Sequence, residues 1–273
     1  MKTIMTRSIR RCIVSLALFF FASGAARLCG QSVTMYAIVY PPYSIVNAQT
    51  GEVYGLAIDL ARAAGKAAGV NVVIETVPMA RIGLSFAENE HGALIGLKNW
   101  VKDTNVETEA LDILNLGFVF YYNKNRYPQG IAYKALYELK PYTIGNIRGS
   151  ATMETLEAAN LNLHLVPEVP LLFKMLVTER IDLAVGGDIT GRLVIRDLYP
   201  DKMSQLESTP HPFFTTQVCV IFKKTDVETT SLFKEGFRAI HKNGVYQKIL
   251  EAYCPPGVTT KSLIPQYMYD LVK

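Results

Sequence analysis

The strongest constraint on the fold of this chain is a predicted strand, rigid turn and helix that follow one another closely. An apolar run at 35–39 meets a Tyr-Pro-Pro-Tyr turn, and an amphipathic helix is predicted directly after Gly55. The two prolines fix φ and favour an extended backbone around them. We therefore expect Tyr40 and Tyr43 on a stiff loop at a strand end, which is a common position for a ring that stacks on a ligand.

Apolar runs of strand length alternate with helical segments over most of the chain, which indicates an α/β architecture with parallel sheets. Two β-α-β-α-β units follow each other, and a late strand and two helices are appended. The predicted strands are 33–39, 71–77, 92–97, 116–122, 142–147, 163–166, 181–186 and 217–222. The predicted helices are 56–68, 80–88, 151–159, 170–177, 189–197, 227–243 and 245–252.

Residues 1–30 are predicted to be a signal peptide. Four basic residues precede an apolar stretch at 13–22, which is too short to span a membrane, and small residues follow at 23–26. Cys29 raises the question of a lipid anchor, but Leu28 stands where a lipidated cysteine needs a small residue before it. We therefore expect a soluble mature chain in the periplasm, without a lipoprotein anchor.

The net charge of +4 comes from the predicted signal peptide. Residues 1–30 contain five of the 28 basic side chains and no acid, so the remaining 23 face 24 acidic side chains. A nucleic-acid partner is not expected, because phosphate binding needs a clustered basic surface. The mature chain is long enough for one large domain or two lobes.

Cysteine and histidine give limited chemical information. Cys219 and Cys254 are the two cysteines of the predicted folded part, and an oxidising compartment would allow them to form a disulfide. The alternative is two buried free thiols. The four histidines are scattered without metal-ligand spacing, so no metal and no cofactor are expected.

The segment that opens with the Tyr-Pro-Pro-Tyr turn and runs into the predicted helix resembles the family 3 solute-binding proteins, which serve polar amino acid ABC transporters. Gly55, Leu56, Ile58 and Leu60 fit the family signature, as does Asp59, while Ala57 stands where the first acid belongs. The alternative for this segment alone is an ordinary strand, turn and helix of any α/β protein.

The resemblance implies a two-lobed (type II) periplasmic binding protein fold, in which each lobe is a mostly parallel sheet flanked by helices. It places 31–121 and 214–260 in lobe 1, 122–213 in lobe 2, and leaves 261–273 as a C-terminal tail. Two crossings between the lobes would form a hinge, and the ligand would lie in the cleft between them. Phe213 and Phe214 are expected to pack at the return crossing.

The resemblance also implies ligand-binding positions, and the most important one is changed. In the family an arginine clamps the α-carboxylate of the ligand with two parallel hydrogen bonds. Asp103 occupies that position in this chain. Gly96 keeps its place, and Lys98 and Trp100 stand where the family has threonines. We expect these three to face the ligand, and the alternative for Trp100 is core packing.

Other ligand contacts are expected on both lobes. Arg81 lies where many members carry a cleft-facing aromatic residue, and could instead be a solvated side chain. Gly149, Ser150 and Thr152 resemble a turn that presents N–H groups at a helix start, or a plain N-cap. Asp188 corresponds to the acid that pairs with a ligand ammonium, or else caps the next helix. We predict that Arg81 and Asp188 face each other across one cleft.

These observations predict a monomeric, non-enzymatic protein that binds a small polar solute, such as an amino acid or a related compound, by lobe closure. Its implied partner is an inner-membrane ABC permease, and the alternative partner is a sensor kinase. One alternative is a periplasmic enzyme similar to cyclohexadienyl dehydratases, for which Glu168 and Glu179 are the candidate general acids. Another is a degenerate module whose closure senses a partner protein.

Overall fold

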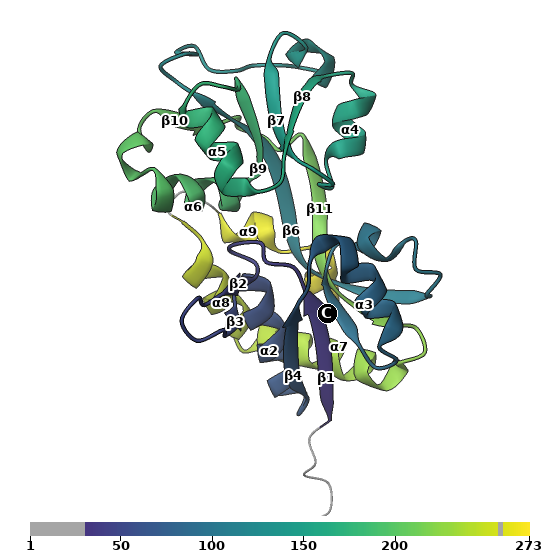
Figure 1. Cartoon of the computed structure of the whole chain (residues 1–273). Coiled ribbons are helices and arrows are strands. Elements are labelled where there is room, and N and C mark those ends of the chain that lie inside the picture. The colour runs from purple at the N-terminus through teal and green to yellow at the C-terminus, as the bar shows by residue number, and fades with distance from the viewer. Residues whose placement is uncertain (1–30, 256–258) are drawn as a thin grey trace, which may run out of the picture.

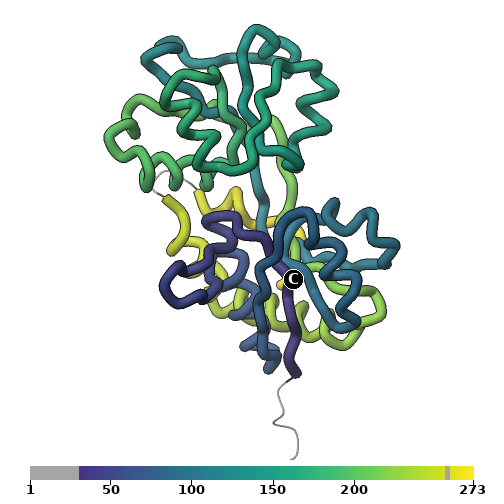
Figure 2. The backbone as a smooth tube through the Cα atoms, in the orientation of Figure 1, coloured from purple at the N-terminus to yellow at the C-terminus, as the bar shows by residue number. Residues whose placement is uncertain are grey.

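The computed structural model describes residues 31–255 and 259–273, and it shows two lobes joined by two long strands (Figure 1). The predicted signal peptide, including Cys29, lies outside the described residues. The backbone runs from lobe 1 into lobe 2 and returns to lobe 1 (Figure 2). The predicted two-lobed α/β fold is confirmed.

The sheet of lobe 1 has the order β4-β1-β5-β11-β6. Its parallel strands are β4 (Asn71–Thr76), β1 (Ser32–Ala37) and β5 (Ala93–Gly96). β11 (Phe214–Lys223) runs antiparallel to β5 and to β6 (Thr108–Asn123). One face packs against α2 (Leu56–Ala67), α7 (Val227–Lys242) and α8 (Val245–Tyr253), and the other against α3 (Ile82–Glu88).

The sheet of lobe 2 continues from β6 in the order β9-β7-β8, and β10 (Leu206–Ser208) pairs with the opposite side of β6. β7 (Thr143–Ile147) lies parallel to both β8 (Asn162–Val166) and β9 (Leu183–Gly187). The helices of this lobe are α4 (Met153–Ala158), α5 (Val169–Val177) and α6 (Asp188–Leu198). Short 3₁₀ turns at 79–81, 98–101, 136–139 and 200–202 complete the connections.

α2 illustrates how local sequence sets these elements. Its apolar residues recur at helical spacing, so Leu56, Leu60 and Ala64 are buried on one face. Asp59 lies in the first turn, where a negative charge is favourable near the helix N-terminus. Gly69 follows with φ of 73°, a left-handed conformation that ends the helix at little cost. The predicted helix at 56–68 therefore agrees with the structure to within one residue.

A single long strand carries the chain from one lobe to the other. β6 has 16 residues; its first part pairs with β11, and residues 118–122 pair with β9 of lobe 2. β11 makes the return crossing, and its first residue, Phe214, lies opposite Phe118. Within the part of the chain that the structure describes, the backbone thus passes between the lobes only along these neighbouring strands, and this region can act as a hinge. The exact lobe boundaries stay a prediction.

The predicted disulfide between Cys219 and Cys254 is wrong, because both thiols are free. Side chains alternate between the two faces of a strand. Val220 and Phe222 of β11 pack towards α7 and α8, whereas Cys219 packs on the α3 face. Its thiol donates to Asp112 Oδ1 at 3.2 Å. Cys254 follows α8, which lies on the opposite face of the sheet, so the two sulfurs are separated by the sheet itself.

The predicted tail folds back onto lobe 1. It forms α9 (Thr260–Leu263) and α10 (Gln266–Leu271), and both helices contact β6. Asn115 Nδ2 donates to the carbonyl oxygens of Ser262 and Ile264 at 3.0 and 3.3 Å. Arg238 Nε of α7 donates to the Leu271 carbonyl at 2.7 Å. The tail is therefore part of the packed lobe 1.

Candidate functional site

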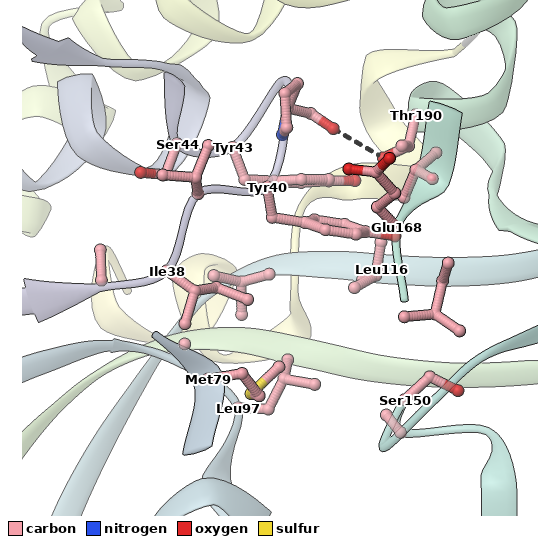
Figure 3. Close-up of a pocket in the computed structure, with 18 of the residues that line it drawn as sticks. Ile38, Tyr40, Tyr43, Ser44, Met79, Leu97, Leu116, Ser150, Glu168 and Thr190 are labelled. Carbon is pink, nitrogen blue, oxygen red and sulfur yellow. Dashed lines mark hydrogen bonds between the residues drawn. The ribbon is translucent and has the colours of Figure 1, made fainter. Parts of the chain in front are cut away.

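A cavity of about 790 Å³ lies between the two lobes. Six parallel strands, three from each lobe, end at or next to it, which is where ligands bind in open α/β sheets. The hinge strands add Leu116, Phe118 and Val218 to its wall. The close-up in Figure 3 shows the loop with Tyr40 and Tyr43 on one side and Ser150, Glu168 and Thr190 of lobe 2 on the other. The cavity is thus built by both lobes together.

The Tyr-Pro-Pro-Tyr loop is held by the start of α2. The backbone N–H of Leu56 donates to Pro42 O at 2.8 Å, and that of Ala57 donates to Tyr43 O at 3.0 Å. These are N–H groups that have no partner inside the helix. Gly55 lies against the loop with φ of 132°, and the peptide bond between Pro41 and Pro42 is cis. The predicted stiff loop is therefore fixed both by its prolines and by the helix.

The two tyrosines of this loop form one aromatic stack. The rings of Tyr40 and Tyr43 have centroids 6.0 Å apart and are 16° from parallel. Both residues line the cavity, as expected. Burial raises the pKa of each phenol, and the nearby Asp188 carboxylate adds to this effect. Both rings therefore present neutral hydroxyl groups.

Two hydroxyl groups of the same loop have no hydrogen-bond partner among the described residues. They are Tyr43 Oη and Ser44 Oγ, whose residues are only 5% and 4% exposed. Both residues line the cavity. A buried hydroxyl without a partner costs about 1–3 kcal/mol, so a solute that bonds to either group would remove this cost.

One hydrogen bond joins the lobes beside the aromatic stack. The buried Thr190 hydroxyl of α6 donates to Pro41 O at 3.1 Å, as the dashed line in Figure 3 shows. The hydroxyl of Tyr40 lies beside the Thr190 hydroxyl and the Gly187 backbone, and both oppose the increase in its pKa. The loop of lobe 1 and the start of α6 are therefore in direct contact.

Gly96 and Trp100 make another part of the wall, in agreement with the prediction. The indole of Trp100 packs on Gly96 so closely that a Cβ atom there would be 2.1 Å from its Cζ3. Trp100 also packs against the apolar clusters of lobe 1. The two alternatives for this residue, cleft wall and core packing, thus hold together.

Lys98 and Arg81 are not among the lining residues. Lys98 lies two residues after Gly96, the last residue of β5. Gly96 pairs with Cys219 of β11, which pairs with Asp112 of β6, and the ammonium of Lys98 therefore reaches the Asp112 carboxylate at 2.7 Å. Arg81 is exposed on the 3₁₀ turn at 79–81, whose Met79 lines the cavity instead. The Arg81 side chain therefore lies outside the wall that we expected it to form.

Of the three predicted binding residues in the turn at 149–152, only Ser150 lines the cavity, next to Ala151. Thr152 is fully buried, and its hydroxyl bonds to the Asn146 amide at 3.1 Å and to the Ser150 hydroxyl at 2.9 Å. Neither hydroxyl caps α4, which has no side-chain cap. Gly149 has φ of 73° and lies outside the lining. The N–H groups of Ser150 and Met153 donate to Ile147 O and Ser150 O at 3.1 Å each, so part of the expected anion cradle is already occupied.

Asp188 lies next to the cavity without being one of its lining residues. It is the first residue of α6, and its Oδ1 accepts the N–H of Ile189 at 2.7 Å. The Tyr121 hydroxyl donates to its backbone oxygen at 2.7 Å. Because Asp188 and Arg81 both lie outside the lining, the structure does not place them opposite each other across the cavity as predicted.

Asp188→Asn is expected to stabilise the free protein at neutral pH. Burial raises the pKa of Asp188, and the Ile189 N–H and Arg192 oppose this only in part. A carboxyl whose pKa is higher in the folded state lowers stability above that pKa, and the cost disappears as the pH falls through it. We expect a higher thermal midpoint for the variant at pH 7 and equal midpoints near about pH 3. Equal midpoints at pH 7 would show that the carboxylate is well solvated.

Several lining residues were missed by the sequence analysis. The missed side chains with polar groups are Ser44, Thr76, Asn146, Arg148, Glu168 and Thr190, of which Glu168 was considered only as a candidate acid. Arg148 directly follows β7, and Glu168 lies two residues after the end of β8. Their position at strand ends could therefore have identified them as lining residues. They are the only charged lining residues among those described, and both are exposed. Glu179, the other candidate acid, bonds to Asn123 and lies outside the lining.

The described residues hold no cluster of three His, Cys, Asp or Glu side chains that could bind a metal ion. Within residues 31–255 and 259–273, no helix has the length and apolar character needed to cross a membrane. The recognisable features are therefore the interlobe cavity, its aromatic loop and its hinge. Together they define the class of two-lobed, periplasmic binding protein-like molecules of type II.

Comparison with known proteins identifies the family. The chain belongs to the bacterial extracellular solute-binding proteins, family 3, whose model matches residues 33–256. The residues that carried the resemblance, from the Tyr-Pro-Pro-Tyr turn into α2, lie within this match. The predicted family is confirmed. No curated protein sequence matches the chain significantly.

Solved structures show the same fold at low identity. A histidine kinase sensor domain with similarity to periplasmic binding proteins has a TM-score of 0.68 and 18% identity, over 86% of this chain and 98% of that chain. An ancestral arginine-binding protein bound to arginine has a TM-score of 0.65 and 17% identity, over 83% and 99%. The substrate-binding protein of an amino acid ABC transporter has a TM-score of 0.63 and 16% identity, over 81% and 98%.

Proposed function

We propose that this protein binds a small solute between its lobes in the periplasm, closes over it, and delivers it to an ABC permease without chemical change. The observation that carries the proposal is the cavity of about 790 Å³, which both lobes and both hinge strands build. Its size suits a small-molecule ligand. The likeness to a substrate-binding protein of an amino acid ABC transporter supports the delivery role.

A sensory role is the second candidate, because a histidine kinase sensor domain shares the fold. Both roles need the same bound solute and the same closure, and they differ in the partner that recognises the closed form. Transport by the permease in membrane vesicles, with and without this protein, distinguishes the two. Solute uptake that depends on the protein favours delivery, and uptake that does not depend on it favours sensing.

The sole tryptophan of the chain gives a direct test of solute binding. Trp100 lines the cavity, so its fluorescence should change when a solute enters. We expect native mass spectrometry of gently purified protein to show a retained solute. Removing it and adding it back should restore the original emission and reduce the radius of gyration. A protein that retains nothing and responds to no metabolite extract would contradict the proposal.

Thr190→Val is expected to weaken binding of that solute about 2- to 12-fold. The change removes the hydroxyl that bonds to Pro41 O, and an intramolecular hydrogen bond contributes roughly 0.5–1.5 kcal/mol. The closed form should lose this contribution and the open form should not. Thr190→Ser, which keeps the hydroxyl, is the matched control in calorimetry. Equal losses in both variants would assign the effect to packing rather than to the interlobe bond.

A further inference from the structure

We propose that the bound solute is a mostly apolar ring compound that carries a hydrogen-bonding group and no carboxylate. The inference rests on the proposed function of the cavity and specifies its ligand. It departs from the expected polar solute, because the charged groups expected around the ligand are absent from the cavity wall.

The wall on the side of lobe 1 and the hinge is apolar. Figure 3 shows Ile38, Met79, Leu97 and Leu116 grouped around the space below the Tyr40 ring. Val39, Ala57, Ile95, Phe118 and Val218 extend this surface. Burying apolar area against such a wall contributes about 25 cal/mol per Å². A small polar solute would leave this surface without a partner.

The aromatic stack favours a flat ring in the ligand. Tyr40 lines the cavity, and Tyr43 supports it from a parallel plane. The loop that carries both is fixed by the hydrogen bonds to Leu56 and Ala57. A rigid aromatic surface of this kind pairs with another ring by offset stacking or edge contact, which adds about 0.5–1.5 kcal/mol beyond area burial.

Among the residues that the structure describes, none supplies the cavity with a buried cation that could hold a carboxylate. Asp103, at the position of the family arginine, is exposed and does not line the cavity. Lys98 is paired with Asp112. Arg148 does line the cavity, but it is exposed, so a carboxylate there would gain only about 0–1 kcal/mol. A carboxylate placed deeper would be desolvated without a cationic partner.

Negative charge near the cavity makes a carboxylate still less favourable. Glu168 lines the rim, and Asp188 lies close enough to the hydroxyls of Tyr40 and Tyr43 to raise their pKa. A carboxylate beside the aromatic stack would lie near the half-buried Asp188 carboxylate, next to the cavity. Neutral groups avoid the repulsion, and a solute with an amine would be tolerated.

The unpartnered hydroxyls of Tyr43 and Ser44 indicate where the polar group of the solute binds. They are the described lining groups that are almost fully buried and make no hydrogen bond. Figure 3 shows the side chains of Tyr43 and Ser44 extending in opposite directions, so a hydroxyl, carbonyl or amide of the solute would satisfy one of them. In the free protein the same two groups lower stability, because they are removed from water without compensation.

The charge preference can be tested with four compounds that share one ring and differ in the side chain. They are 2-phenylethanol, 2-phenylethylamine, 3-phenylpropionate and L-phenylalanine, and binding is followed by calorimetry and by the emission of Trp100. We expect the alcohol to bind at least about tenfold more tightly than either carboxylate, a difference of about 1.4 kcal/mol. The amine should also bind more tightly than both. Tighter binding of either carboxylate, or no binding of the alcohol, would overturn the inference.

The outcome for the solute class is separable from the outcome for the proposed function. A retained solute that carries a carboxylate and closes the lobes would leave the proposed function in place and overturn this inference. Failure of all four compounds together with the absence of any retained or extract-derived solute would contradict both. A retained ring compound without a carboxylate would support both.

The hydroxyl groups can be tested with a matched control. We expect Tyr43→Phe and Ser44→Ala to have thermal midpoints equal to or above the wild type without ligand, and at least one of them to bind 2-phenylethanol about 2- to 12-fold more weakly. Tyr267 also has a buried hydroxyl without a partner, but it lies on α10 outside the cavity. Tyr267→Phe should match their stability effect and leave affinity unchanged. Unchanged affinity in both loop variants would overturn the assignment.

Discussion

Gly55→Ala is expected to lower the free energy of unfolding by about 3 kcal/mol or more and to abolish solute binding. Gly55 has φ of 132° and ψ of 168°, a conformation that is essentially restricted to glycine and costs other residues roughly 1–3 kcal/mol. A Cβ atom would also lie 2.7 Å from Tyr43 O and 2.8 Å from Pro42 O. These neighbours are backbone atoms, so they cannot turn away as a flexible side chain could, and overpacking adds about 1–3 kcal/mol.

The binding defect has a separate physical origin. Pro42 O and Tyr43 O accept the first N–H groups of α2, so displacing them detaches the aromatic loop from the helix. Tyr40 and Tyr43 would then no longer be held at the cavity. Chemical denaturation measures the stability change, and the emission of Trp100 measures binding of the retained solute.

Gly51→Ala is the control for the conformational part of this effect. Gly51 also has positive φ, at 72°, but a Cβ atom there would meet nothing within 4 Å. Its substitution should cost only about 1 kcal/mol and leave binding unchanged. If Gly55→Ala costs no more than Gly51→Ala, the contact between the loop and α2 is weaker than the structure indicates.

The fold was predictable because the relevant signals are local. The alternation of apolar runs with helical segments, and glycines at helix ends such as Gly69, each depend on a few neighbouring residues. The location of the site at the strand ends follows from the same alternation. Tyr40 and Tyr43 were predictable as lining residues because the prolines between them fix the loop.

The direction of individual side chains was not predictable, because it depends on residues far away in the sequence. Lys98 turns to Asp112 because β5, β11 and β6 place Gly96, two residues before Lys98, in one row with Asp112. Met79 rather than Arg81 lines the cavity, although both lie in one 3₁₀ turn. The disulfide prediction failed for a similar reason, since the strand face that Cys219 occupies depends on register.

The contact between the lobes shows the same limit. Thr190 and Pro41 are 149 residues apart in the sequence, and nothing local to either indicates that they meet. The unpartnered hydroxyls of Tyr43 and Ser44 likewise become visible only when all their neighbours are placed. These long-range features carry most of the information about the ligand, whereas local patterns carry most of the information about the fold.

Tyr40→Ala is expected to weaken binding of the retained solute by about 30-fold while the protein stays folded. An aromatic side chain buries 150–250 Å², and if roughly 80 Å² of the ring faces the solute, its loss costs about 2 kcal/mol at 25 cal/mol per Å². The removed ring also leaves Tyr43 without its stacked neighbour. Far-UV circular dichroism without solute should be unchanged, because Tyr40 is only partly buried and lies at the edge of the main apolar cluster.

Tyr40→Phe separates the ring from its hydroxyl in this experiment. The variant keeps the stacking surface and loses only the group that lies beside Thr190 and Gly187 of lobe 2. We expect a loss of affinity of about 2- to 12-fold, smaller than that of the alanine variant, because one hydrogen-bonding group is removed and the apolar area remains. Calorimetry with the retained solute gives both values. Affinity of Tyr40→Ala within about threefold of the wild type, a difference of only ~0.7 kcal/mol, would show that the solute does not contact the ring.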